Sequence, residues 1–145
     1  MQLDQLHYAI LNELQLNARM SNAEIGRRIG LTAPAVAERI KKMQEEGIIK
    51  SFTAAVEFSK LDYLQRVMIA IKLPPDNIPG FLKEAEKTEG ITKIVHTTGE
   101  YCFFIDMVLK STEELVPVLN KLRKFGETTT FSILAVPVDS KAVRL

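Results

Sequence analysis

Few side chains in this 145-residue sequence could take part in covalent catalysis, because it holds only two histidines and one cysteine. His96 and Cys102 flank a predicted hairpin, and in one strand register they would face each other as a base and a nucleophile. A register shifted by one residue puts them on opposite faces of the sheet. We favour an interpretation in which both side chains serve packing, so we expect no catalytic pair.

Other catalytic and cofactor patterns are also missing. The seven glycines are never closer than four residues apart, which excludes a G-x-G fingerprint and a Walker loop. The two histidines and the cysteine form no cluster with metal-ligand spacing. We therefore expect a protein that is not an enzyme and that uses no cofactor or metal ion.

A row of small and basic side chains offers a different chemistry, the recognition of double-stranded DNA. Four residues at intervals of three, four and three share one face of a predicted helix: Thr32, Ala35, Arg39 and Lys42. The start of this helix is small and would fit a major groove about 12 Å wide, with Arg39 and Lys42 reaching bases or phosphates farther along. The start of the preceding helix suits phosphate binding. The DNA-binding candidates are therefore Ser21, Asn22, Thr32, Ala33, Ala35, Arg39 and Lys42.

The charge distribution supports this interpretation only modestly. Arg19 to Lys50 carries seven basic residues against four acidic ones, although the formal net charge of the whole chain is +1. A dimer would present this local excess twice to phosphates. The same segment is also compatible with the solvated face of an inert bundle. A third alternative is a ligand-binding or protein-docking module that never meets DNA.

Three predicted helices position the basic face. The first has an apolar stripe with spacings of three and four: Leu3, Leu6, Ile10, Leu11 and Leu14. The second begins with a capping box between Ser21 and Glu24 and a hydrophobic staple between Met20 and Ile25. Its buried side is expected to consist of Ala23, Ile25 and Ile29, and Gly30 suits the left-handed position after its last turn.

The third helix completes a helix-turn-helix. Thr32 is suited to cap it, and Pro34 fits its first turn. Its buried stripe is expected to be Val36, Ile40 and Met43, and it stops at Gly47. The β-forming residues from 48 to 56 then predict a strand or small wing.

The rest of the chain predicts the element order βαββαβ. Strands are expected over 66–73, 91–98, 101–109 and 128–136, with Gly99-Glu100 as a hairpin turn. A helix over 79–88 is expected to bury Phe81, Leu82 and Ala85. A second helix follows a capping box between Ser111 and Glu114, with a kink or a later start at Pro117. This order predicts a ferredoxin-like domain and places the whole chain in the α+β class.

One face of the predicted sheet has no cover. Both helices of this fold pack on the same face, yet residues 101–105 are apolar on both sides of their strand, and Leu134 and Val136 alternate with further apolar residues. A strand that is apolar on both faces is usually buried on both faces. We therefore expect the sheets of two subunits to pack together in a homodimer.

Short motifs spread over both halves of the chain match the pattern of one family. They are Leu3-Asp4 with Ile10-Leu11, Ser21-Asn22-x-Glu24-Ile25 with Arg28, Gly30 and Leu31, Val36-x-x-Arg39-Ile40, Gly47-Ile48-Ile49, Gly99-Glu100-Tyr101, and Gly126-x-x-x-Thr130-x-Ser132. The ordered set resembles the Lrp/AsnC (feast/famine) transcription regulators. The resemblance implies a winged helix-turn-helix joined to a RAM-type αβ-sandwich that senses ligands. It also implies DNA-binding dimers that often form octamers, with amino acids as frequent effectors.

Three positions depart from the usual pattern of that family. The family usually has Asp at the positions of His7 and Cys102, and Gly-Val where this chain has Gly126-Glu127. The resemblance places the effector site around Thr98, Gly99, Glu100, Tyr101, Cys102 and Thr130. Because a thiol cannot replace a charged acceptor for an ammonium group, we expect a conventional amino acid to bind there weakly or not at all. The alternative is an effector-independent architectural protein that wraps DNA.

The predicted organisation has three parts. These are a DNA-binding helix-turn-helix over 1–50, a strand and linker over 51–65, and a ferredoxin-like oligomerisation and ligand-sensing domain over 66–145. The N-terminus does not resemble a signal peptide. The longest uncharged stretch, Thr128 to Val138, is far shorter than the roughly 20 residues that span a bilayer. We expect a cytoplasmic, nucleoid-associated protein with no membrane contact.

Overall fold

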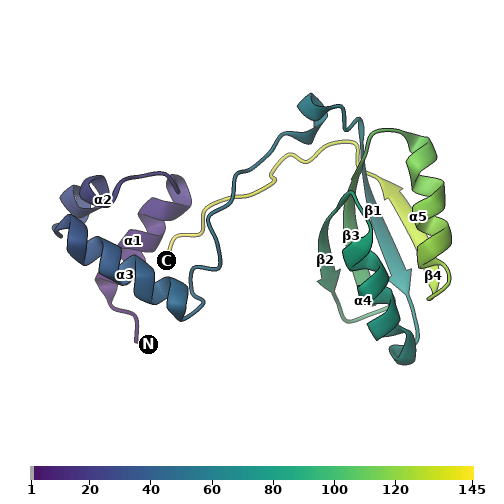
Figure 1. Cartoon of the computed structure of the whole chain (residues 1–145), viewed down its shortest axis with the longest axis horizontal. Coiled ribbons are helices and arrows are strands. Elements are labelled where there is room, and N and C mark those ends of the chain that lie inside the picture. The colour runs from purple at the N-terminus through teal and green to yellow at the C-terminus, as the bar shows by residue number, and fades with distance from the viewer. Residues whose placement is uncertain (1) are drawn as a thin grey trace. The chain divides into compact units, whose positions relative to one another are not determined.

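The computed structural model describes residues 2–145 and divides into two compact units (Figure 1). The first contains the chain up to Ala55 together with Val138–Leu145, and the second comprises Val56–Pro137. Each unit has its own hydrophobic core. Within residues 2–145, no helix is long and apolar enough to cross a membrane.

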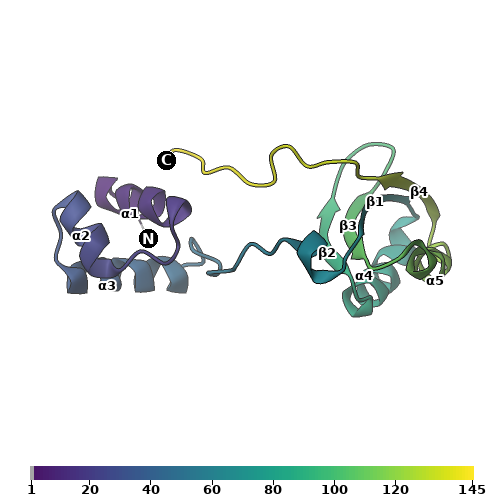
Figure 2. The same ribbon diagram turned by 90° about the horizontal axis from the view of Figure 1, so that it is seen from above.

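The first unit is a bundle of three helices, α1 (Gln5–Leu16), α2 (Asn22–Ile29) and α3 (Ala33–Glu45) (Figure 2). Its fully buried side chains are Ile10, Ile25, Val36 and Met43, so the apolar stripes predicted the inward faces correctly. Ala23 was expected in this core but is exposed. Residues two positions apart in sequence point about 200° apart around the helix axis, so Ala23 cannot share the face of Ile25.

Two different caps begin α1 and α2. At α2, Ser21 Oγ accepts the Glu24 N–H at 3.1 Å, but the predicted capping box lacks its second half, because the Glu24 carboxylate pairs with Arg27 and Arg28. A complete capping box begins α1 instead. There Asp4 Oδ1 accepts the His7 N–H at 2.9 Å, and His7 Nδ1 accepts the Asp4 N–H at 3.2 Å. The second position of such a box is normally Glu or Gln, which is why this one escaped prediction.

The turn between α2 and α3 brings the two helices into close contact. Gly30 adopts the predicted left-handed conformation, with φ of 75°, and Thr32 Oγ1 accepts the Ala35 N–H at 3.4 Å to cap α3. A side chain at Gly26 would be impossible here, since a Cβ would lie 2.3 Å from the Leu31 carbonyl oxygen. The Leu31 N–H also donates to Gly26 O at 2.9 Å. The backbone itself therefore sets the approach of α3 to α2.

The strand predicted over residues 48–56 is not formed. The N–H groups of Ile48 and Ile49 both donate to Met43 O and close the end of α3, and residues 50–57 have no regular structure. β-forming residues need a neighbouring strand to complete a ladder. The only sheet in the described chain lies in the second unit and contains no strand from this segment.

The last residues of the sequence pack against α1. Val143 exchanges two hydrogen bonds with the Gln15 side chain, from its N–H to Oε1 and from Nε2 to its carbonyl oxygen, both at 2.9 Å. Leu145 exchanges two with the Asn12 side chain, at 3.0 and 3.2 Å. Residues three apart on a helix and two apart on an extended chain each share a face. The two amides therefore hold the backbone of residues 143–145 across α1.

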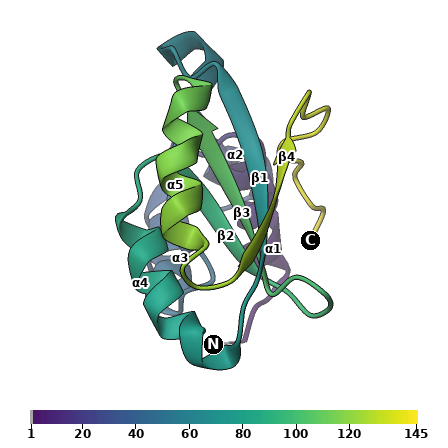
Figure 3. The same cartoon turned by 90° about the vertical axis from the view of Figure 1, so that its right-hand side faces the viewer.

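The second unit is a four-stranded antiparallel sheet with two helices on one face (Figure 3). Its elements are β1 (Gln65–Lys72), α4 (Ile78–Lys87), β2 (Ile91–His96), β3 (Phe103–Leu109), α5 (Leu115–Leu122) and β4 (Glu127–Ser132). Short 3-10 turns at Phe58–Leu61, Pro75–Asn77 and Thr112–Glu114 precede β1, α4 and α5. The strand order β2-β3-β1-β4 confirms the predicted βαββαβ, ferredoxin-like fold.

The core of this unit lies between the sheet and its helices. Alternate residues of the two central strands pack there against residues of the two helices. The strand residues are Val67, Ile69 and Ile71 of β1 with Phe103, Ile105 and Met107 of β3, and the helix residues are Phe81 and Ala85 of α4 with Val118 and Leu122 of α5. Leu82 was expected to join them but is 41% exposed. It follows the buried Phe81 by about 100° around α4 and therefore points away from the sheet.

Two details near the end of the second unit differ from prediction. A 3-10 turn delays the start of α5, as Pro117 indicated, but the predicted capping box is not formed, because Glu114 Oε2 accepts the Lys110 N–H at 3.0 Å. β4 ends at Ser132 rather than 136, and Leu134 is 97% exposed. Ser132 already lies opposite Val67, close to the start of β1, so the ladder has little strand left to pair with.

Candidate nucleic-acid interface and effector site

Of the predicted DNA-contacting residues of α3, Ala35, Arg39 and Lys42 lie on one side of the helix, whereas Ala33, two residues before Ala35, points to the other side. Thr32 and Lys42 are exposed, whereas Ala33, Ala35 and Arg39 are half-buried. Ser21 and Asn22 lie at the start of α2, where the Ser21 hydroxyl is already engaged in capping the helix. The helix face thus changes from small residues at its start to charged residues toward its end.

This face of α3 forms one wall of an open cleft beside the start of α1. The cleft has a volume of about 450 Å³ and is lined by Asp4, His7, Ala35, Glu38, Arg39 and Lys42. Glu38 was not considered in the sequence analysis, although its spacing of four from Lys42 is a known pairing signal. Its carboxylate lies 2.8 Å from Lys42 Nζ, and this hydrogen bond lowers the pKa of Glu38.

Arg39 is not the freely exposed side chain that its position on the helix predicted. Its side chain is 25% exposed, and Nη1 donates to both carboxylate oxygens of Asp4, at 2.9 and 3.0 Å. The same nitrogen lies 2.9 Å from Nδ1 of the buried His7. These contacts tie α3 to the N-terminus of α1, so Arg39 also has a structural role that the sequence analysis missed.

Asp4 is held in its charged form by this arrangement. The hydrogen bond from the His7 N–H, supported by that from Arg39, lowers the pKa of Asp4 from 3.8 to about 2. A carboxylate that accepts backbone N–H bonds and faces a guanidinium is favoured in its ionised form. Asp4 is therefore an anion throughout the physiological pH range, and Arg39 always has a charged partner.

The predicted effector residues gather at the β2–β3 turn, except for Thr130. Thr98 and Glu100 are exposed in this turn, and Gly99 has φ of 115°. Thr130 lies in the middle of β4, opposite Ile69. The neighbouring Thr129, which the sequence analysis did not single out, approaches the hairpin instead, with its hydroxyl 3.2 Å from the Tyr101 hydroxyl.

The polar groups of this hairpin are largely engaged within the chain. Lys72 Nζ donates to Glu100 Oε1 at 3.2 Å, and Cys102 Sγ donates to Leu73 O at 3.5 Å. His96 stacks on Phe103, with ring centroids 4.3 Å apart. His96 and Cys102 thus each have a different neighbour, in agreement with the packing role favoured for both.

The two units together define a DNA-binding helix-turn-helix module and a ferredoxin-like regulatory module in one chain. Residues 3–50 match the winged helix-turn-helix DNA-binding model, and residues 66–143 match the Lrp/AsnC ligand-binding domain. The chain therefore belongs to the Lrp/AsnC family of DNA-binding transcription regulators. This is a family of regulators rather than enzymes.

Individual relatives agree with this assignment. The chain is 32% identical to the transcriptional regulator LrpB of Bacillus subtilis over 126 residues, which covers 87% of this chain and 85% of LrpB. The structure of B. subtilis LrpC matches with a TM-score of 0.87 and 28% identity, over 97% of this chain and all of LrpC. A Neisseria meningitidis regulator in complex with L-methionine shares the fold, with a TM-score of 0.88 at 19% identity over 98% of this chain and 96% of that one.

Proposed function

We propose that α3 enters the major groove of double-stranded DNA with the face formed by Thr32, Ala35, Arg39 and Lys42, and that Ala33 contacts the DNA from the first turn of the helix. The observation that carries this proposal is the change from a small residue, Ala35, to the cations Arg39 and Lys42 along one open side of the helix, where Glu38 is the acid that α3 contributes to the cleft. A small tip allows close approach to base edges, and the cations farther along suit phosphates. Ser21 and Asn22, at the start of α2, would contact the phosphates of the DNA backbone, because helix N-termini attract anions.

Arg39 has two roles in this proposal. Within the described chain its hydrogen bonds all run through Nη1, which leaves Nε and Nη2 to donate to a base or a phosphate. The contact with Asp4 holds the guanidinium in place before DNA arrives. A side chain that is already ordered loses less conformational freedom on binding.

A homodimer would form through the open face of the sheet. The strand register places Val95, Phe104, Ala70 and Thr129 in one row on this face, and Asp106, Met68 and Phe131 in the next. Exposed apolar side chains such as Val95 and Phe131 on an open sheet face, even with the polar Asp106 and Thr129 among them, favour a protein partner. A second copy supplies a matching surface and brings a second α3 to the DNA, and octamers would assemble from such dimers.

The proposed effector class is an amino acid or a related small molecule, because residues 66–143 match a ligand-binding domain and a regulator of the same fold binds L-methionine. At the hairpin, Thr98, Gly99, Glu100, Tyr101, Cys102 and Thr130 would bind such a molecule weakly. The Glu100 carboxylate already forms an ion pair with Lys72, and the thiol of Cys102 stands where an aspartate is expected in this family. The same internal pairing favours a second candidate function, effector-independent wrapping of DNA at the cytoplasmic nucleoid.

The direct experiment is a gel-shift assay of the full chain against genomic DNA fragments at two salt concentrations. The proposal predicts preferred fragments whose binding weakens as salt rises, because counterions are released when Lys and Arg meet phosphates. Lys42→Ala should weaken binding and reduce the salt dependence, whereas Lys124→Ala, an exposed lysine of the second unit, should leave both unchanged. Equal, weak binding to all fragments would contradict sequence preference.

A further inference from the structure

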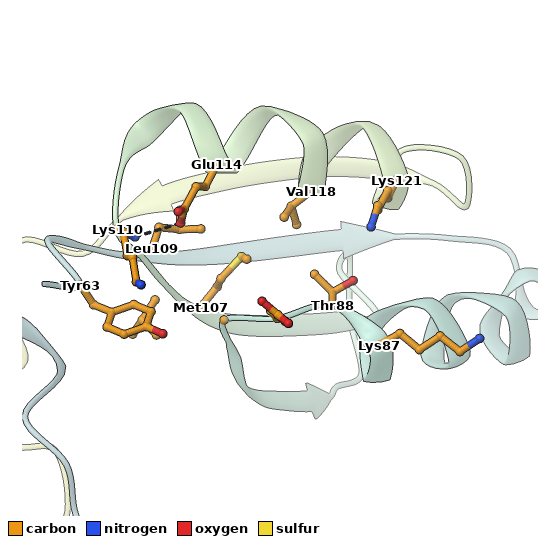
Figure 4. Close-up of a pocket in the computed structure, with 12 residues that line it drawn as sticks. Tyr63, Lys87, Thr88, Met107, Leu109, Lys110, Glu114, Val118 and Lys121 are labelled. Atoms are coloured by element: carbon orange, nitrogen blue, oxygen red, sulfur yellow. Dashed lines mark hydrogen bonds between the residues drawn. The ribbon is translucent and has the colours of Figure 1, made fainter. Parts of the chain in front are cut away.

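The pocket of the second unit between α4, α5 and the sheet has a volume of about 460 Å³ and carries both signs of charge at each end (Figure 4). Lys87 and Lys121 lie with Glu89 at one end, and Glu114 lies beside Lys110 at the other. This distribution singles out no ligand, in contrast to the ordered charges of the cleft beside α3.

His7 is the buried residue of the cleft beside α3, with 7% of its surface exposed. Its Nδ1 accepts the Asp4 N–H at 3.2 Å and lies 2.9 Å from Arg39 Nη1, so two donors converge on this nitrogen. A ring nitrogen accepts a hydrogen bond only when it carries no hydrogen, which makes the imidazole neutral in this arrangement. One of the contacts that tie Arg39 to α1 therefore requires an uncharged His7.

The same ring nitrogen also faces an acceptor. Nδ1 lies 2.7 Å from Asp4 Oδ1, and a hydrogen on Nδ1 would turn this contact into a charge-assisted hydrogen bond. Protonation would also place a cationic ring against the Arg39 guanidinium, whose Nη1 lies within 3.2 Å of both ring nitrogens. Two cations at this distance repel each other, and both compete for the Asp4 carboxylate. The surroundings of His7 thus favour a different arrangement for each protonation state.

The charged groups that line the cleft around His7 are Asp4 at the start of α1 and Arg39, Glu38 and Lys42 on α3. Imidazole is the one type of side chain among them that titrates between about pH 5 and 8. Asp4 is ionised over this range because its pKa is about 2, and the hydrogen bond from Lys42 holds the pKa of Glu38 below its ordinary value of 4.5. Arginine and lysine side chains are cations over the same range. A change of charge in this cleft therefore comes from His7.

We propose that His7 is a positioning residue for Arg39 and that protonation of His7 releases Arg39 from the cleft. With a neutral ring, Asp4 and His7 hold the guanidinium in the orientation that meets DNA. With a charged ring, His7 pairs with Asp4 in its place. A released arginine keeps its charge but loses its fixed orientation, so it attracts phosphates of any sequence and discriminates less between bases. The sequence preference then falls as the pH falls, an inference that rests on the DNA contact of Arg39 in the proposed function.

Two-dimensional NMR of the full chain without DNA tests the coupling of the two side chains. The proposal predicts that the Arg39 Nε–H signal shifts between about pH 8 and 5 with the same midpoint as the His7 ring signals. His7→Gln keeps a capping-box acceptor that does not titrate, so its Arg39 signal should stay constant. His96→Gln removes the other imidazole of the sequence and should shift as the wild type does. An Arg39 signal that does not follow His7, or that shifts equally in His7→Gln, would overturn the proposal.

Fluorescence anisotropy tests the consequence for DNA recognition. The ratio of the affinities for a preferred and an unrelated duplex should fall about three- to tenfold in the wild type between about pH 8 and 5, and should be the same at both pH values in His7→Gln. The ratio cancels the general gain in phosphate attraction that an added positive charge brings. A wild-type ratio that stays constant or rises would contradict the proposal. Absence of any preferred duplex at the higher pH would instead contradict the proposed function, and the NMR titration without DNA would still decide whether His7 positions Arg39.

Discussion

Arg39 on α3 donates through Nη1 to both carboxylate oxygens of Asp4, the residue that caps α1. The candidate recognition helix is thereby fixed to the helix that starts the chain, by an ion pair at the edge of the proposed DNA face. The half-buried arginine keeps two nitrogens for other partners. Orientation of α3 and contact with DNA are thus coupled through one side chain.

The charge of Asp4 should stabilise the first unit in a pH-dependent way. Its pKa in the folded chain is about 2, below the ordinary value of 3.8, so ionised Asp4 favours folding above that value and loses this effect as the pH falls toward 2. Asp4→Asn keeps a good N-cap but removes the charge. In thermal unfolding we expect a lower Tm for the variant at neutral pH and no difference near pH 2. A Tm difference that is constant over this range would contradict the ion-pair explanation.

Arg39→Ala should weaken specific DNA binding by roughly 1–3 kcal/mol if the guanidinium contacts a base. If it contacts a phosphate, all sequences should lose affinity together, with a shallower salt dependence. Fluorescence anisotropy with specific and unrelated duplexes distinguishes these outcomes. Circular dichroism provides the folding control, because the Asp4 contact is lost as well. Unchanged affinity in the folded variant would remove Arg39 from the interface.

Phe104→Lys should prevent formation of the proposed homodimer. Phe104 lies opposite Ala70 and Val95 on the open sheet face, where a dimer would bury the new ammonium group without a partner. Leu82→Lys is the matched control, since Leu82 is an exposed apolar residue on α4. In sedimentation equilibrium at micromolar concentration, the wild type and Leu82→Lys should be dimeric or larger. Dimers of Phe104→Lys would exclude this face as the interface.

Gln15→Ala should release Val143 from α1, while Asn12 still holds Leu145. Both hydrogen bonds between Gln15 and Val143 are lost, so hydrogen exchange at the Val143 amide should approach the rate of an unstructured peptide. Gln5→Ala, a change at the first residue of α1, should leave this rate unaltered. Equal protection of Val143 in both variants would show that the Gln15 amide does not hold the segment.

The structure follows the sequence pattern most closely where that pattern is local. Gly30 and Thr32 mark the turn before α3, and the alternation of β1 and β3 sets the inward face of the sheet. The strand expected over residues 48–56 and the expected end of the last strand at residue 136 were wrong for the opposite reason. A strand ends where its partner ends, so the end of β4 at Ser132 depends on where β1 begins at Gln65, 67 residues earlier along the chain.

The contacts of Asp4, Arg39 and Gln15 were also not predicted, because their partners are distant in the sequence. The partners Asp4 and Arg39 are 35 residues apart, and Gln15 and Val143 are 128 apart. Such contacts follow from the packing of elements and leave no periodic signal in the sequence.

The central claim, that the small tip of α3 meets DNA, is tested most directly by Ala35→Glu. The substitution suits a helix but places a carboxylate on the proposed groove-facing side, where DNA phosphates would repel it. Asn120→Glu adds the same charge to an exposed position on α5 and serves as the control. By fluorescence anisotropy on a preferred duplex, we predict that Ala35→Glu loses more than about tenfold in affinity while Asn120→Glu binds within about twofold of the wild type. Wild-type affinity in a folded Ala35→Glu variant would contradict DNA recognition by this face.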